Sequence, residues 1–326
     1  MDLILNTFGT CLTKDNEAFM VLHKDGKQRI PPADLHSIQI GRGAQISSDA
    51  VLLAIENEIE ILFVDNTGKP AGRIWSSRYG SISTIRKGQL EFVRSKEAVK
   101  WIKEVIQNKI ENQQALLWTF VASLPELNRR IEHTAMRIEK YREKVNKLQG
   151  ETIADIARQL RGLEGIVSRI YFEEMNSFLP DEYRFEQRSQ HPATDVTNAL
   201  LNYGYGVLYG KIEGALIRAG IDPYIGVFHR DEYNRPVLVY DVIEKYRIWV
   251  DYVVYMLLAQ RVIGEECYSV KPDGSYWLEG LGKRILIQSL NDYLSEVIPI
   301  KKLERSRLTH IDLYAQSLAQ AFKAKS

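Results

Sequence analysis

Short apolar runs separated by polar turns dominate residues 1–84. The runs are rich in strand-forming residues and lie at Leu3–Leu5, Ala18–Leu22, Ser37–Ile40, Ile59–Val64 and Gly72–Trp75. Asp-Gly and Asn-Thr-Gly sequences, which form turns, stand between them. One helix is predicted after Ser47 or Ser48, with Val51, Leu52 and Ile55 as its apolar stripe. Residues 1–84 are therefore predicted to form a β-rich domain.

From about residue 85 onward, apolar positions recur every three or four residues, as they do in amphipathic helices. Helices are predicted over residues 85–123, 127–148, 152–178, 195–219, 240–262 and 283–297, with a last one from residue 309. The predicted fold class is therefore α+β. It consists of an N-terminal β-rich domain, residues 1–84, followed by an all-α domain, residues 85–326.

One charged residue interrupts an apolar helix stripe. Positions 157, 160, 164, 167 and 171 share one helix face, and position 164 is a glutamate. A buried carboxylate is costly, so it normally pairs with a cation or binds a metal ion. Gly162 and Gly165 cost ~1 kcal/mol each relative to alanine, which is expected where a ligand or backbone comes close. Two interpretations of Glu164 stay open: a metal ligand, or an ion pair with Arg161 or Arg169.

The stretch GVFHRDEYNRPVLVYDVIEKYR, residues 226–247, places one histidine ahead of two carboxylates. His229 precedes a turn-rich segment, and Asp241 and Glu244 are three residues apart in a helix predicted to begin near Tyr240. Acidic residues in a first helical turn complement the helix dipole, so a purely structural role is the alternative. One imidazole with two or three carboxylates suits Mg²⁺ or Mn²⁺, which activates phosphodiester chemistry.

The charge balance excludes a protein that is basic over its whole surface. The chain has 43 basic and 42 acidic side chains, so any phosphate-binding surface is local. Two basic runs, residues 85–109 and Lys301–Arg307, are candidate phosphate tracks, with ordinary solvated helix faces as the alternative.

Other features narrow the class of protein further. The longest apolar stretches are too short to span a bilayer, and the N-terminus lacks a basic signal region. Cys11 and Cys267 match no zinc or disulfide pattern, so we expect a soluble cytoplasmic protein with no membrane partner. The glycines of residues 203–212 miss the spacing of a phosphate loop, so no nucleotide cofactor is expected.

Three blocks, in this order, resemble the CRISPR-associated integrase and endonuclease of the adaptation stage, the "Cas one" family. They are RGLEGIVSRIYF from residue 161, RSQHPATDVTNALLNYGYG from residue 188, and GVFH from residue 226 followed by LVYDVIEKYR from residue 238. The resemblance covers nearly the whole chain. It implies that Glu164, His229 and Glu244 are metal ligands and that Asp241 is an acidic residue beside them. The predicted DNA-binding residues are Arg188, Asn198, Tyr205 and Arg230.

The resemblance also implies an activity and partners. Members of this family are Mg²⁺- or Mn²⁺-dependent DNA nucleases that work as homodimers and join a small "Cas two" partner protein. The complex inserts double-stranded protospacer DNA into the repeat of a CRISPR array by attack of a 3′-hydroxyl on a phosphodiester. Two alternatives remain: a metal nuclease of the same fold that cleaves branched repair intermediates, and a non-enzymatic DNA-binding scaffold.

Overall fold

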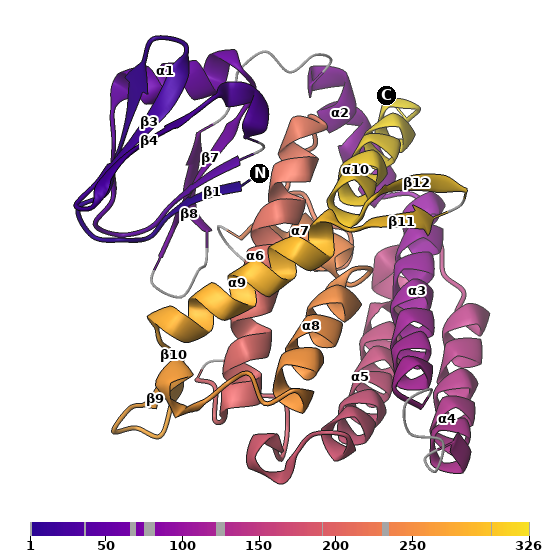
Figure 1. Ribbon diagram of the computed structural model, residues 1–326. Helices are drawn as coiled ribbons and strands as arrows, with labels where there is room; N and C mark the ends of the chain where they lie inside the picture. The colour runs from indigo at the N-terminus through magenta and orange to yellow at the C-terminus, as the bar shows by residue number, and fades with distance from the viewer. Residues whose placement is uncertain are drawn as a thin grey trace. The chain divides into compact units, whose positions relative to one another are not determined.

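The computed structural model describes residues 2–35, 37–65, 70–74, 82–121, 128–190, 192–229, 235–300 and 302–325 (Figure 1). The chain divides into two compact units, Met1–Gly80 and Ser81–Ser326. We call them the N-terminal unit and the helical unit and describe each by itself. No helix in these ranges combines the length and the apolar character needed to cross a membrane.

The N-terminal unit contains two small sheets. The first has the strand order β1-β5-β7-β8, in which β1 (Asp2–Leu5), β5 (Ser37–Ile40) and β7 (Glu60–Val64) run parallel and β8 (Pro70–Ile74) is antiparallel to β7. The second has the order β4-β3-β2-β6 and consists of β4 (Gly26–Ile30), β3 (Ala18–His23), β2 (Cys11–Asp15) and β6 (Gln45–Ile46). The predicted strand run through Trp75 and the predicted turn at residues 66–68 extend outside the described residues.

Helix α1 was predicted from the sequence at its start but not in its buried face, and two strands of this unit were not predicted. Helix α1 (Ser48–Glu56) begins as predicted, because the Ser47 hydroxyl accepts a bond of 3.2 Å from the Ala50 amide. Its buried face consists of Ala50, Leu53 and Ala54, whereas Leu52 is 55% exposed, so the predicted stripe was wrong. Strands β2 and β4 were not predicted, since β4 exposes every residue except its last and shows no apolar run.

The helical unit consists mainly of α-helices. They are α2 (Ile82–Val93), α3 (Lys96–Val121), α4 (Asn128–Lys147), α5 (Ile153–Ser177), α6 (Val196–Arg218), α7 (Val237–Ile243), α8 (Arg247–Ala259), α9 (Gly280–Ser295) and α10 (Arg307–Lys323). Two short hairpins, not predicted, lie between the later helices. They are β9 (Tyr268–Val270) with β10 (Tyr276–Leu278), and β11 (Val297–Ile300) with β12 (Leu303–Ser306).

The packing of six helices positions the functional residues. α3 packs on both α4 and α5, and α6 packs on α7 and α8. Gly204 allows the close approach of α6 and α8, because a Cβ atom there would lie 2.6 Å from Val250 Cγ1. The helix predicted over residues 240–262 is in fact two helices, since α7 ends at Ile243 and α8 begins at Arg247. The turn between them carries Glu244.

Candidate active site

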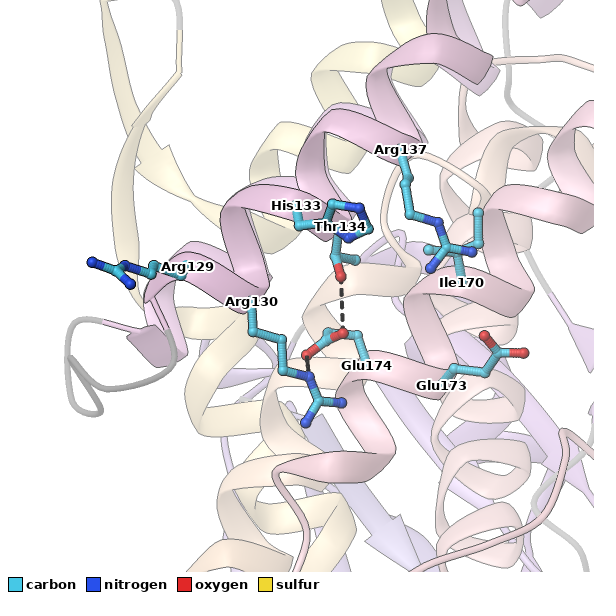
Figure 2. A pocket seen from close by; sticks show the side chains of 8 residues that line it. All are labelled: Arg129, Arg130, His133, Thr134, Arg137, Ile170, Glu173 and Glu174. Atoms are coloured by element: carbon cyan, nitrogen blue, oxygen red, sulfur yellow. Dashed lines mark hydrogen bonds and ion pairs between the residues drawn. The ribbon is translucent and has the colours of Figure 1, made fainter.

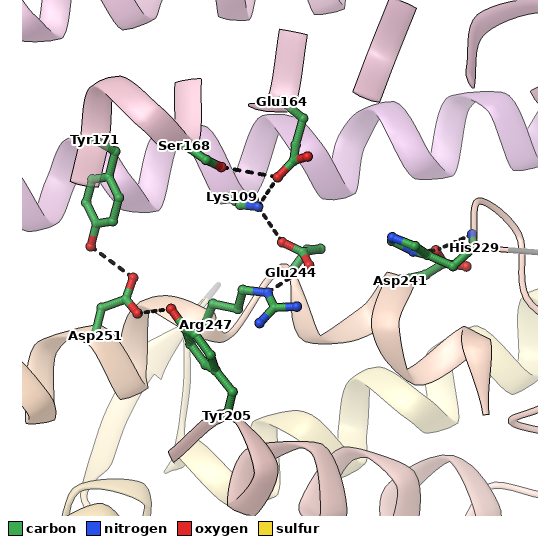
Figure 3. A network of polar contacts seen from close by, with 10 residues as sticks. All are labelled: Lys109, Glu164, Ser168, Tyr171, Tyr205, His229, Asp241, Glu244, Arg247 and Asp251. Atoms are coloured by element: carbon green, nitrogen blue, oxygen red, sulfur yellow. Dashed lines mark hydrogen bonds and ion pairs between the residues drawn. The ribbon is translucent and has the colours of Figure 1, made fainter. Parts of the chain in front are cut away.

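Two predicted site residues from distant segments meet at one lysine. Lys109 of α3 donates to Oε1 of Glu164 on α5, and its Nζ lies 2.6 Å from Oε2 of Glu244 (Figure 3). Glu164 also accepts a 3.2 Å bond from Ser168, one helical turn further along α5. Arg247 Nε donates to the other oxygen of Glu244 at 2.7 Å. Two carboxylates and two cations therefore form one compact cluster.

Mutual pairing keeps this cluster ionised although it is buried. Burial alone would raise the pKa of Glu244, but the charges of Arg247 and Lys109 outweigh it and lower the pKa to about 2. Burial likewise opposes the charge on Lys109, yet Glu244 and Glu164 raise its pKa above the ordinary value. Glu244 is thus a carboxylate and Lys109 an ammonium at neutral pH.

Neither arginine that was predicted as a possible partner of Glu164, Arg161 or Arg169, pairs with it. Arg161 donates instead to the Phe228 carbonyl at 3.2 Å and lies over the Phe228 ring. The partner of Glu164 is Lys109. The Glu164 side chain is 26% exposed, so it lies at the edge of the buried face of α5 rather than within it. This edge position leaves the carboxylate accessible.

His229 is oriented by Asp241. The Asp241 carboxylate is fully buried and accepts bonds from the backbone amides of Val227 (2.7 Å), Phe228 (3.0 Å) and His229 (3.1 Å). It also lies 2.7 Å from His229 Nδ1. An ionised carboxylate only accepts, so Nδ1 carries the proton and Nε2 presents a lone pair. The His229 side chain is 40% exposed, and Nε2 is therefore the atom it offers to a ligand.

Two features of the local sequence determine the conformation of the loop that carries His229. Gly226 is required, because a Cβ atom there would lie 2.4 Å from the His229 carbonyl oxygen. Asp241 was predicted in a first helical turn with Glu244, which was wrong, because Pro236 lies at the N-cap of α7 and the helix begins at Val237. Asp241 therefore lies within α7 and faces the loop, whereas Glu244 lies beyond its last residue.

The chemical types of the available ligand atoms suit a hard divalent cation. Glu164 and Glu244 bring carboxylate oxygens from α5 and from the turn after α7, and His229 brings a ring nitrogen. Among the described residues, no three His, Cys, Asp or Glu side chains gather into a ready-made cation site. The point where the two carboxylates converge is occupied by the Lys109 ammonium. The Lys109 ammonium thus lies where a metal ion would neutralise both carboxylates.

Two guanidinium groups lie against the ring of Tyr205. The guanidinium groups of Arg188 and Arg247 lie 5.7 Å and 4.7 Å from its centroid. Its hydroxyl donates to the buried Asp251, which also accepts a 2.9 Å bond from Tyr171 (Figure 3). Tyr205 therefore links α6 to α8 beside the cluster.

The other predicted DNA-binding residues differ in accessibility. Asn198 is fully buried, donates to the Gln187 carbonyl at 2.9 Å and accepts from Arg188, so its amide bonds within the protein. This burial gives Asn198 the task of holding the loop that carries Arg188. Arg188 itself also donates to Asn202 at 2.9 Å. Arg230 lies outside the described residues.

Three residues of this site were not predicted: Lys109, Arg247 and Asp251. Lys109 had a readable signal, since positions 102, 106, 109 and 113 share one face of α3 and Ile102 and Ile106 are buried. A lysine on this stripe is the counterpart of the glutamate on the stripe of α5. The two charges were each visible in the sequence, but their pairing was not.

The basic runs predicted as phosphate tracks are dispersed in the fold. In the first, Lys109 belongs to the active-site cluster and Lys103 donates to the carbonyls of Asn146 and Leu148. In the second, Arg307 is buried and pairs with Glu296 at 2.6 Å. Lys109, Lys103 and Arg307 thus make contacts within the protein, and phosphate contact by the other basic side chains of the two runs stays a prediction.

Comparison with known proteins places this architecture in a class. Residues 3–292 match the family described as CRISPR associated protein Cas1. A CRISPR-associated endonuclease Cas1 from Archaeoglobus fulgidus is 32% identical over 94% of this chain and 88% of its own length. A casposase bound to an integration product has the same fold, with a TM-score of 0.83, 20% identity, and coverage of 100% of this chain and 91% of its own. A chain of a Cas6-RT-Cas1--Cas2 complex also matches, with a TM-score of 0.80, 23% identity and coverage of 100% of this chain. This chain spans 35% of that longer chain.

The fold and the family match thus define the class of CRISPR-associated nucleases and integrases. The chain belongs to the Cas1 family of CRISPR-associated proteins. The resemblance, the α+β fold class and the function they imply, that of a Cas1 nuclease and integrase of CRISPR adaptation, are confirmed.

Proposed function

We propose that the cluster around Glu164, His229 and Glu244 is a Mg²⁺- or Mn²⁺-dependent centre acting on phosphodiesters of double-stranded DNA. The reaction is attack by the 3′-hydroxyl of a short DNA on a phosphodiester of the CRISPR repeat. The observation that carries this proposal is the convergence of two carboxylates from separate elements on the Lys109 ammonium, together with a 40% exposed imidazole whose Nδ1 is bound by Asp241. A scaffold protein has no need for this arrangement.

Each residue has a defined task in the proposed reaction. Glu164, His229 Nε2 and Glu244 would hold the divalent cation, which would supply charge neutralisation at the phosphate and activation of the hydroxyl. Asp241 fixes the ring of His229 in the tautomer that leaves Nε2 able to bind. Arg247 keeps Glu244 ionised and in place through the 2.7 Å bond. Lys109 balances the two carboxylates and prevents them from repelling each other.

Partners follow from the relatives rather than from the site. One similar solved structure is a Cas1–Cas2 complex and another holds an integration product, which supports a Cas2 protein and DNA as partners of this chain. We place it in a homodimer that joins Cas2. Strand joining exchanges one phosphodiester for another, so the reaction needs no nucleotide as an energy source. Of the predicted DNA contacts, Arg188 and Tyr205 remain proposals.

Strand joining tests the proposal directly. The purified chain, alone and with Cas2, is given a labelled duplex with a free 3′-hydroxyl and a target that contains a CRISPR repeat. We expect joining with Mg²⁺ or Mn²⁺, none in EDTA, and a loss of at least about 100-fold for E164A, H229A or E244A, because each removes a proposed ligand. E91A, which removes an exposed glutamate of α2, is the matched control and should keep full activity.

Two results would contradict the proposal in different ways. Full joining in EDTA, or in any of the three alanine variants, would remove the metal centre from the reaction. Cleavage of branched DNA without joining to a repeat would instead favour the nuclease that acts on repair intermediates. A donor duplex that lacks the 3′-hydroxyl separates hydroxyl attack from simple hydrolysis. This donor cannot be joined, so any cut that remains in the target DNA is made by hydrolysis.

A further inference from the structure

A row of exposed basic side chains runs along α4, apart from the active-site cluster. Its members share one flank of the helix and are Arg130, His133, Arg137, Lys140, Lys144 and Lys147. We call this set the α4 row. Spacings of three and four residues place such side chains above one another on a helix. From the first member to the last the row spans about 26 Å, at about 1.5 Å per residue.

The acidic residues of α4 lie to one side of the row, and of these only Glu143 also lines a hollow beside it. Glu132, Glu139 and Glu143 are spaced by seven and four residues and fall on a different side of the helix. Glu139 is bound there by Arg142 at 2.7 Å, and Arg142 also reaches Glu111 of α3 at 2.8 Å. The helix therefore carries separate apolar, acidic and basic stripes. This separation concentrates positive charge on a chain whose net charge is only +1.

Most members of the row have no acidic partner. Arg130 is the exception within the described chain, since it pairs with the buried Glu174 at 2.7 Å, and Glu174 also accepts a 2.9 Å bond from Thr134 (Figure 2). Lys144 lies 4.9 Å from the Tyr141 ring centroid. For Arg137, Lys140 and Lys147, no described carboxylate forms an ion pair. Their charge is available to an external anion.

The surface beside the row is hollowed on both sides of Arg137. One open hollow of about 540 Å³ is lined by Arg129, Arg130, His133 and Arg137 of α4, with Ile170 and Glu173 of α5 opposite them (Figure 2). A second, of about 430 Å³, is lined by Arg137, Lys140, Lys144 and Lys147, together with Tyr141 and one acidic residue, Glu143. Basic side chains thus border two adjoining recesses along one helix. A rod-shaped polyanion could contact both.

We infer that the α4 row binds the phosphate backbone of double-stranded DNA without regard to sequence. The inference rests on the proposed function in assuming that this chain acts on DNA. A span of about 26 Å corresponds to roughly seven or eight base pairs at 3.4 Å each. α4 packs against α5, which carries Glu164, so DNA on the row lies on the helix pair that includes the active-site carboxylate.

The composition of the flank favours DNA over a protein partner. Protein interfaces have an apolar and aromatic centre with few charges, whereas backbone recognition of DNA depends on Lys and Arg. Met136 is the large exposed apolar residue on α4, at 54%, and it lies to the acidic side of the row. The row itself offers five or more cationic side chains, and the one aromatic ring beside them is that of Tyr141.

Two variants with the same change in net charge test the inference. The row variant R137Q/K140Q/K144Q removes three exposed cations that have no carboxylate partner. The control K96Q/R142Q/K325Q removes three surface cations that are already paired, with Glu151 at 2.5 Å, Glu139 at 2.7 Å and Glu97 at 2.9 Å. Affinity for two unrelated duplexes is measured by fluorescence anisotropy between about 50 and 200 mM salt. Thermal midpoints verify that both variants fold.

In the row variant, affinity for both duplexes should fall by about ten- to a hundred-fold, and the slope of log affinity against log salt should flatten by about two to three. The control should stay within about threefold of the parent. R137K/K140R/K144R, which keeps the charges, should behave as the parent does. Parental affinity and slope in the row variant would overturn the inference while leaving the proposed function intact. Failure of the parent itself to bind DNA would overturn both.

Discussion

The active-site cluster and the α4 row use the same residue types in opposite ways. Lys109 is 8% exposed and balances two carboxylates, whereas the lysines of the row are exposed and form no ion pair with a described carboxylate. Buried charges lose hydration and are retained only when they are paired, so each depends on its partner. Exposed charges cost little and gain when a polyanion releases its counterions. Pairing therefore separates the proposed metal centre from the proposed DNA surface.

The two regions should also respond to different perturbations. Salt screens exposed charges but acts little on buried pairs. Loss of one partner in a buried network leaves an uncompensated charge and costs several kcal/mol, whereas an exposed unpaired lysine adds little to stability. Substitutions in the cluster should therefore change folding stability and metal response. Substitutions in the row should change only the binding of DNA.

The largest stability effect should come from Asp241, because its buried carboxylate receives three backbone amides and His229 Nδ1. D241A leaves these donors without an acceptor and should lower the free energy of unfolding by about 3 kcal/mol or more. D241N keeps the shape but turns an NH₂ group toward some of the donors, so it should also destabilise. The measurement is thermal or denaturant unfolding of the metal-free protein.

The matched control is D292N, which changes an exposed aspartate of α9 and should stay within about 0.5 kcal/mol of the parent. If D241N were as stable as the parent, the carboxylate would not be the acceptor that holds the 227–229 loop. The comparison between buried and exposed charges would then fail at its strongest point.

A smaller effect with a clear metal signature is expected for Lys109. K109M leaves Glu164 and Glu244 facing each other without the ammonium, so the protein in EDTA should melt at a lower temperature than the parent. A divalent cation can neutralise both carboxylates, and millimolar Mn²⁺ should therefore raise the melting temperature of K109M more than that of the parent.

K103M is the matched control, since Lys103 lies on the same helix but donates to backbone carbonyls rather than to carboxylates. It should lose some stability and keep the Mn²⁺-induced shift of the parent. An equal shift in K109M and K103M would show that the ammonium and the metal ion do not share a place. Glu164 and Glu244 would then bind no common cation.

Sequence periodicity predicted the elements better than it predicted their partners. The helices from α4 to α6 begin and end within one or two residues of prediction, because their apolar stripes are continuous. β4 was missed because it is almost wholly exposed, and the break between α7 and α8 lies within a run that is apolar on both sides. Local pattern carries no signal for either feature.

The same limit applies to the site. Glu164 was singled out because a charge interrupted an apolar stripe, and that signal is local. Its partner Lys109 is 55 residues away, and the choice of this lysine over Arg161 or Arg169 depends on how α3 packs against α5. The α4 row could have been predicted from its regular spacing of three and four residues. Residues 85–109 and Lys301–Arg307 were predicted instead, because basic residues are dense there. Charge density along the sequence is a poorer guide to a binding surface than charge placed by helical period.

The smallest expected change concerns the two glycines beside Glu164. Gly162 and Gly165 lie on the exposed side of α5, and a Cβ atom at either position would meet no other part of the described protein within 4 Å. G162A/G165A should therefore stabilise the helix by about 1 kcal/mol per site, since alanine has the higher helix propensity. If the bare backbone exists to admit DNA, joining should fall by about tenfold while stability rises.

G280A, at the equally open first residue of α9, should leave joining unchanged. A double variant that is more stable and joins DNA at the parental rate would show that no ligand approaches this side of α5. The path of DNA from the α4 row to Glu164 would then have to avoid the glycines.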